Sequence, residues 1–244
     1  MSATEPRSLK RKVTKSRCRE VGTPSKNRGP ENLQEALKGI SNLYSKSLES
    51  HGFTPKSVGW KDEVSQRLRF EKLAQVVDLG VARRGITVND WGCGYGAMFP
   101  YLDEVLGKSL TCYYGYDISE KMLAAAFRFV ANPRAEWINS SEVTFDADYS
   151  FVSGTFNVRL EANDALWTAY IKEKLLNLAC RSVEGFAFNL LSTYVDWKQD
   201  NLYYGDPFMF FDFCKQNISK YVSLLHDYPL YEWTIIVRKK VSRG

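Results

Sequence analysis

The strongest constraint on the fold is an alternation of strand and helix patterns that begins after Leu79. Short apolar runs predict strands over 86–90, 110–117, 134–138, 148–153 and 185–191. Amphipathic segments between them predict helices over 97–106, 119–130 and 163–181. Repetition of strand, helix and strand predicts an α/β protein with a parallel sheet covered by helices on both faces.

The end of the chain departs from this alternation. Asp206 followed by Pro207 is typical of a helix N-cap and first turn, and predicts a helix over 207–217. Two β-rich runs over 219–227 and 231–239, separated by a short turn with a proline, predict a terminal hairpin.

Helical patterns also precede the sheet. Apolar residues recur at helical spacing over 31–50, and a second helix is predicted over 62–79. We therefore divide the chain into a tail over 1–30, an N-terminal helical unit over 31–79 and an α/β domain over 80–244.

The basic character of the chain is concentrated in its first 28 residues. They hold nine Lys or Arg and two acids, a net charge of +7, whereas the whole chain has a net charge of +5. With few large apolar side chains, such a segment buries too little surface to offset its ordering entropy, which predicts a disordered basic tail. Three roles are possible for this tail: a solvated segment without function, a localisation signal, or a segment that binds an anionic partner electrostatically.

The cysteine pattern excludes two classes of small protein. Five cysteines are an odd number, with no CxxC pair and no metal-ligand spacing, so neither a disulfide scaffold nor a zinc module is expected. No apolar run approaches the roughly 18 residues of a membrane span, and no signal peptide is apparent. We expect a cytoplasmic protein without a metal site or a membrane partner, and leave its oligomeric state open.

The loop after the first predicted strand contains the residues that most clearly indicate a ligand-binding site. Asp90 ends that strand, and Gly92, Gly94 and Gly96 lead into a helix. The glycines let a ligand approach the backbone, and the helix N-terminus offers unpaired N–H groups. Alone, this pattern also fits a tight turn or the dinucleotide loop of an oxidoreductase. A carboxylate at Asp90, however, would repel a pyrophosphate and suits a ligand with an ammonium group.

A second acid follows at the expected distance. Asp117 ends the second predicted strand, 21 residues after Gly96, where a carboxylate can accept hydrogen bonds from ribose hydroxyls. Ser119 is placed to cap the next helix, and Ile118 to pack on a base.

The two motifs together resemble a known family. Asp-x-Gly-Cys-Gly-x-Gly over 90–96 and Asp-x-Ser-x-x-Met-Leu over 117–123 look like the class I S-adenosylmethionine-dependent methyltransferases, over roughly 86–240. The resemblance implies a doubly wound, Rossmann-like sheet of seven strands whose last strand is antiparallel, in agreement with the terminal hairpin. It also implies S-adenosylmethionine as the cofactor and S-adenosylhomocysteine as its product, and the segment over 31–79 resembles the lid that many of these enzymes fold over the cofactor.

The same resemblance implies a set of cofactor contacts. The floor under the methionine part would be formed by Gly92, Cys93, Gly94 and Gly96. Asp90 would face the amino group, and Asp117 would bind the ribose hydroxyls. Ile118 would lie against adenine, with Ser140 near the adenine edge. Ser153 would reach the site from the end of the fourth strand.

Further candidates come from the helical unit and from the polar loops. Tyr44, Trp60 and Arg69 could reach the methionine carboxylate or close the site, although Trp60 would otherwise be core and Arg69 a solvated side chain. The acceptor side is assigned to three residues of the later loops: Asn157, Tyr203 and Tyr204.

The reaction type is only partly constrained. The segment Ser-Gly-Thr-Phe over 153–156 lacks the motif of amino-group DNA methyltransferases, and no cysteine follows a proline as in pyrimidine C5 methyltransferases. His226 is a candidate base, although a lone strand histidine is more often structural. We predict methyl transfer to O or N of a small-molecule or sugar-like acceptor. A nucleic-acid methyltransferase anchored by the basic tail, a dinucleotide-dependent oxidoreductase and a non-catalytic cofactor-binding module are the alternatives.

Overall fold

A computed structural model describes residues 29–240, with side chains from residue 33 onward. The predicted tail, apart from its last two residues, lies outside the described residues. Seven strands form one sheet in the order β3-β2-β1-β4-β5-β7-β6. Their bounds are Ile86–Trp91 (β1), Leu110–Asp117 (β2), Ala135–Asn139 (β3), Ala147–Val152 (β4), Ser182–Leu191 (β5), Tyr221–Leu225 (β6) and Glu232–Arg238 (β7).

The direction of the strands confirms the predicted topology. Strands β1 to β5 pair in parallel, whereas β7 runs antiparallel to both β5 and β6. After β1 the chain adds β2 and β3 on one side of β1, and then adds β4 and β5 on the other side. The direction in which strands are added therefore reverses at β1. Ligands of open α/β sheets bind at such a switch point, at the carboxyl ends of the strands.

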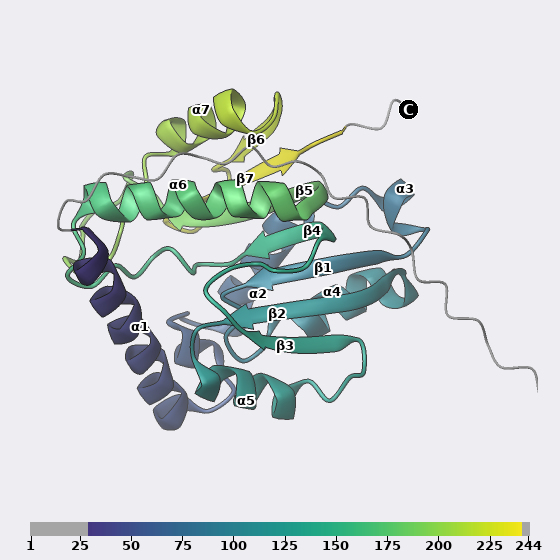
Figure 1. The fold of residues 1–244 in the computed structure, drawn as a ribbon, viewed down its shortest axis with the longest axis horizontal. Helices are drawn as coiled ribbons and strands as arrows, with labels where there is room; N and C mark the ends of the chain where they lie inside the picture. The colour runs from purple at the N-terminus through teal and green to yellow at the C-terminus, as the bar shows by residue number, and fades with distance from the viewer. Residues whose placement is uncertain (1–28, 241–244) are drawn as a thin grey trace, which may run out of the picture.

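Helices cover both faces of the sheet (Figure 1). The longer ones are α2 (Glu63–Ala74), α4 (Met98–Leu106), α5 (Glu120–Phe129), α6 (Asp164–Arg181) and α7 (Pro207–Asn217). Asp206 caps α7 by accepting hydrogen bonds from the amides of Phe208 and Met209, as its place before Pro207 predicted.

The core is divided between the two faces because strand side chains alternate. On β5, Phe186 and Phe188 enter the cluster beneath α6 and α7, whereas Ala187 between them enters the cluster with α2 and α4. The alternation fixes which side chains of β1 and β2 can reach each helical layer.

The N-terminal helical segment differs in part from its prediction. Helix α1 (Gly29–His51) matches the periodicity, but the helix predicted over 62–79 ends at Ala74 and is followed by a short α3 (Leu79–Ala82). Asp78 interrupts the helix because its side chain accepts a hydrogen bond from the amide of Gly80 and caps α3 instead. Among the helices of residues 29–240, none is long and apolar enough to cross a membrane.

Candidate active site

A cavity lies at the carboxyl ends of the central strands, beneath helix α1. Counting the space open to solvent at its mouth, it encloses about 750 Å³. Its walls come from the ends of β1, β2 and β4, from the loop after β3, and from α1 and α6. Figure 1 shows α1 running across this end of the sheet. The cavity therefore occupies the place where the topology predicts a ligand.

The glycine loop forms one wall of the cavity with its backbone. The amides of Gly92 and Cys93 both donate to the carbonyl of Tyr116, at 2.8 and 2.9 Å, which joins the loop to the end of β2. A Cβ on Gly92 would lie 2.2 Å from Oγ1 of Thr155, and φ at Gly92 is +77°. Only glycine fits this close approach.

Asp117 presents a carboxylate to the same cavity. Its Oδ2 accepts from the amide of Gly94 at 3.0 Å and its Oδ1 from the amide of Ser119 at 2.8 Å. Burial raises the pKa of Asp117 to about 6, against the effect of these hydrogen bonds. The carboxylate is therefore mostly ionised at neutral pH and keeps lone pairs for a ligand hydroxyl.

Helix α1 and the segment after it close the cavity from above. Tyr44 from α1 and Trp60, which follows the 3-10 helix η1 (Pro55–Val58), both line it. The hydroxyls of Ser45 and Ser119 lie 3.0 Å apart and tie α1 to the N-terminus of α5. Burial, and the nearby Asp117 carboxylate, raise the pKa of Tyr44 to about 12. The Tyr44 hydroxyl thus stays protonated at neutral pH.

A second, smaller cavity of about 310 Å³ adjoins the first behind the glycine loop. It is lined by Asp90 and Cys93, and it shares Gly92, Gly94 and Ser153 with the larger cavity. Asp90 accepts a hydrogen bond from the hydroxyl of Tyr113, and burial raises the pKa of Asp90 to about 7.

Comparison with known proteins identifies the family. A protein of Mycobacterium tuberculosis, Rv1506c, is named as a methyltransferase with no acceptor given. It is 49% identical over 156 residues, which are 63% of this chain and 93% of the relative. The chain is a member of the class I methyltransferase family. No family model matches it.

Solved structures share the class I methyltransferase fold. The magnesium protoporphyrin IX methyltransferase of Synechocystis, solved with bound S-adenosylmethionine, matches with a TM-score of 0.53 at 15% identity, over 88% of this chain and all of that one. The N-methyltransferase NodS of Bradyrhizobium japonicum matches with a TM-score of 0.55 at 13% identity, over 81% of this chain and 98% of that one. The predicted family, fold and class of enzyme are thus confirmed, and the oxidoreductase and non-catalytic alternatives are wrong.

The larger cavity is lined by many of the residues that the sequence assigned to the cofactor. These are Gly92, Gly94, Asp117, Ile118, Ser140 and Ser153, together with Tyr44 and Trp60. Ser153 adds an unexpected feature, because its Oγ is buried without a hydrogen-bond partner among the described residues.

Two members of the predicted floor lie elsewhere. Cys93 lines only the smaller cavity, and Gly96 lines neither. A Cβ on Gly96 would lie 2.6 Å from Cη2 of Trp137, so this glycine serves close packing of the loop on β3. Neither residue lines the larger cavity, and their place in the floor under the cofactor stays a prediction.

Arg69 is turned away from the cavity. Its Nη2 lies 2.6 Å from Oε1 of Glu232, and its guanidinium covers the ring of Trp60 at 3.8 Å from the centroid. Arg69 forms its ion pair with Glu232 and does not line the cavity, so its contact with the methionine carboxylate stays a prediction. Its contact with Trp60 places it behind the cavity wall.

The predicted acceptor residues do not line the cavity. Asn157 is buried and accepts from the amide of Leu191 at 3.0 Å, and the Tyr203 hydroxyl lies 2.6 Å from that of Thr168. The Tyr204 hydroxyl accepts from the amide of Gln199. All three polar groups bond to protein groups, and their assignment to the acceptor stays a prediction.

His226 does not reach the methyltransferase site either. It is exposed after β6, with its ring 5.8 Å from that of Tyr194, and it is absent from the lining of both cavities. The assignment of His226 as a base therefore has no support from the cavity lining and stays a prediction.

Sequence reasoning missed most of the opposite wall. Leu37 and Ile40 of α1, with Trp167 and Tyr170 of α6, line the cavity. Helical periodicity marked Leu37 and Ile40 as buried positions, but periodicity does not tell a buried core position from a cavity wall.

Proposed function

We propose that this methyltransferase binds S-adenosylmethionine in the larger cavity and transfers its methyl group to a small-molecule acceptor. The observation that carries the proposal is the Asp117 carboxylate, held by the amides of Gly94 and Ser119 beside the glycine loop. A ribose diol donates two hydrogen bonds, and a carboxylate at this place can accept both.

The residues present fit the cofactor. A Cβ on Gly94 would lie 3.0 Å from Cγ1 of Val58, so a side chain there would crowd the cavity wall. The orphaned Oγ of Ser153 offers a hydrogen-bond partner to the polar end of a ligand. Both features suit a ligand that presses on the backbone and carries polar groups at one end.

Each part of the cofactor has a candidate contact. Asp117 would hold the ribose hydroxyls, Ile118 would lie against adenine, and Ser140 would meet the adenine edge. Asp90 would face the amino group from the adjoining cavity, where its carboxylate lies beyond Gly92.

The helical segment over 31–79 would act as the lid of the domain that follows it. Tyr44 and Trp60 line the cavity from this segment, and the Ser45–Ser119 hydrogen bond ties it down. A lid excludes water and orients the two reactants, which is the main requirement of methyl transfer.

When bound, S-adenosylmethionine supplies a methyl group on a good sulfur leaving group. The described residues that line the cavity include no His, Lys, Arg or Glu. Their contribution is therefore positioning and exclusion of water rather than removal of a proton.

Calorimetry with S-adenosylmethionine and S-adenosylhomocysteine tests the proposal. Asp117→Ala removes two charge-assisted hydrogen bonds, each worth about 1.5–3 kcal/mol, so we expect affinity to fall at least about tenfold. Asp212→Ala, which removes an exposed carboxylate on α7, is the matched control and should bind normally. Equal affinity in wild type and Asp117→Ala would overturn the proposed function.

A further inference from the structure

The larger and the smaller cavity meet at a common wall. The residues of this wall line both cavities and are Val58, Trp60, Gly92, Gly94 and Ser153. From the common wall the larger cavity continues to Asp117, and the smaller one continues to Asp90. In S-adenosylmethionine the sulfur joins the ribose to the amino-acid chain. If Asp117 holds the ribose and Asp90 faces the amino group, the sulfur lies at the common wall.

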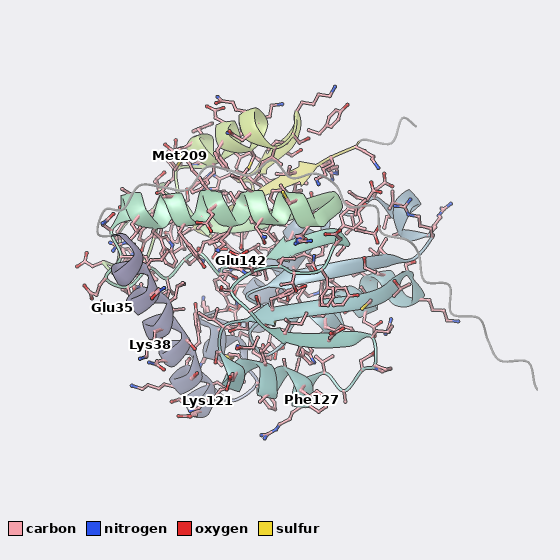
Figure 2. The ribbon with its side chains drawn as sticks, viewed as in Figure 1. Glu35, Lys38, Lys121, Phe127, Glu142 and Met209 are labelled. Atoms are coloured by element: carbon pink, nitrogen blue, oxygen red, sulfur yellow. The ribbon has the colours of Figure 1, made fainter. Side chains whose placement is uncertain are left out.

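The ionisable side chains on either side of the common wall are carboxylates. Among the described residues that line the two cavities, Asp117 and Asp90 are the only acids, and there is no Lys, Arg or His. Figure 2 shows Lys38 of α1 pointing away from the sheet, and Nζ of Lys121 on α5 pairs with Oε1 of Glu49 at 2.6 Å on the surface. A group at the common wall therefore lies between two carboxylates, which favours a positive charge there over a neutral atom.

The carboxylate of the cofactor has uncharged donors in the smaller cavity. Gln66 of α2 lines this cavity, and its Oε1 accepts from the hydroxyl of Tyr95 at 3.3 Å, so its amide nitrogen is left to donate. Ala97 and Met98 line the same cavity at the N-terminus of α4, and a helix N-terminus favours an anion. The carboxylate is also common to S-adenosylmethionine and S-adenosylhomocysteine. A difference in affinity between these two ligands therefore reports on the sulfur and not on the carboxylate.

Trp60 is the aromatic residue of the common wall, and its ring is held from behind. The guanidinium of Arg69 covers the ring at 3.8 Å from the centroid, and Glu232, whose side chain is 1% exposed, neutralises Arg69. The rest of the Trp60 side chain lines the two cavities. A cation over an indole ring is attracted by its π electrons. The orphaned Oγ of Ser153 adds an oxygen lone pair to the same wall.

We infer that the common wall, through the ring of Trp60 and the two flanking carboxylates, selects the positive sulfonium of S-adenosylmethionine over the neutral sulfur of S-adenosylhomocysteine. Trp60 is then a specificity-determining residue, and Arg69 is a positioning residue that holds its ring. The inference rests on the proposed function and deepens it. Methyl transfer leaves the C–S electron pair on sulfur, which becomes neutral. The wall therefore holds the product less tightly than the cofactor, and this difference favours exchange of product for cofactor.

Calorimetry on the full chain at pH 7.5 with three ligands tests the inference. Burial raises the pKa of Asp117 to about 6 and that of Asp90 to about 7, so both are mostly ionised at this pH. S-adenosylmethionine is positive at sulfur, sinefungin carries an ammonium group at the same place, and S-adenosylhomocysteine is neutral there. We expect both positive ligands to bind at least about fivefold more tightly than S-adenosylhomocysteine. Binding of S-adenosylhomocysteine as tight as that of S-adenosylmethionine would overturn the inference, and so would a preference that sinefungin does not share.

Variants of two tryptophans assign the preference to the common wall. Trp60→Leu removes the ring and should reduce the preference for the positive ligands to less than about twofold. Trp60→Phe keeps a ring with a weaker attraction and should give an intermediate preference, so it decides the test where Trp60→Leu does not fold. Trp197→Leu makes the same substitution at a tryptophan that is 64% exposed and lines neither cavity, and should keep the full preference. A preference at Trp60→Leu, or at Trp60→Phe in its place, equal to that of the wild type would overturn the inference.

Failure of the proposed function gives a different result. If none of the three ligands binds the wild-type chain, the proposed function is overturned, and with it this inference. If all three bind with equal affinity, the inference alone is overturned and the binding of S-adenosylmethionine stands.

Discussion

Arg69 of α2 and Glu232 of β7 form a buried ion pair across the end of the sheet, with 2.6 Å between Nη2 and Oε1. The carboxylate also accepts from Nδ2 of Asn189 at 2.8 Å. Asn189 in turn accepts from the amide of Gly154 at 2.7 Å. Through Gly154, and through the stacking of Arg69 on Trp60, this network holds two elements of the cavity wall.

Breaking this pair should destabilise the fold strongly. Arg69→Ala leaves the Glu232 carboxylate buried without its cation, which costs about 3–5 kcal/mol of unfolding free energy. Arg67→Ala on the same helix breaks an exposed, solvent-screened pair with Glu104 and should lower the unfolding free energy far less. Urea unfolding monitored by circular dichroism measures both, and similar losses in the two variants would refute a special role for the buried pair.

Gly154 is expected to tolerate no side chain. Its φ is +68°, and a Cβ would lie 2.2 Å from Cζ2 of Trp60. Gly154→Ala should therefore cost about 3 kcal/mol, through backbone strain and overpacking together. Gly52→Ala is the control, because Gly52 has φ of +62° but open space around it, and should cost about 1 kcal/mol.

The contact with Trp60 can be separated from backbone strain by a double variant. If Trp60 is the obstacle, Trp60→Ala should make Gly154→Ala less costly, and the two effects should not add. If the changes in unfolding free energy caused by the two substitutions add strictly, the Trp60 side chain moves aside at no cost and is not the obstacle.

The burial of Asp90 predicts an unusual dependence of stability on pH. Because its pKa is raised to about 7 in the folded protein, the folded state binds more protons than the unfolded state between about pH 4 and pH 7. This contribution to stability is full below the unfolded pKa and is lost as the pH rises through 7. From pH 5 to pH 8 it should decrease by about 2–3 kcal/mol.

Asp90→Asn keeps a side-chain oxygen for the Tyr113 hydroxyl and removes the titration. Carboxylates with a lowered pKa, such as Asp62 and Asp227, stay ionised throughout pH 5–8 and do not contribute to the change. Urea unfolding of the apo protein at several pH values should therefore give a flatter profile for Asp90→Asn. Parallel profiles in wild type and variant would contradict the assignment to Asp90.

The helices and strands could be predicted from the sequence because the patterns that specify them act between residues that are close together in the chain. Strand β2 and helix α7 have the predicted bounds, since alternation and an Asp-Pro cap act within a few residues. Asp117, Gly92 and Gly94 lie at the cavity for the same reason. Asp117 is placed by the end of β2, and the two glycines are placed by the end of β1.

Two of the predicted site residues that lie outside the cavity have partners far along the chain. Arg69 is 163 residues from Glu232, and Asn157 is 34 residues from the amide that it accepts from. A sequence pattern shows that a charge or amide needs a partner, but it does not show which one satisfies it. For Arg69, the partner that the structure shows is a carboxylate on β7, which no pattern near Arg69 indicates.

Asp117 should make cofactor affinity depend on pH. Its pKa of about 6 lies in the accessible range, and protonation replaces a carboxylate acceptor by a weaker neutral one. If only the ionised form binds the ribose hydroxyls well, S-adenosylhomocysteine affinity should be about tenfold weaker at pH 5 than at pH 7 and level off near pH 7. The α-amino group of the ligand titrates near pH 8 and stays protonated over this range.

Two variants assign the titration to its residue. Asp117→Asn should bind weakly with little change between pH 5 and pH 7, because the amide does not titrate. Asp90→Asn should keep the part of the change centred near pH 6. Calorimetry at fixed ionic strength measures both. A pH dependence that survives in Asp117→Asn and disappears in Asp90→Asn would assign the titrating group to the smaller cavity, and would remove Asp117 as the main electrostatic contact of the cofactor.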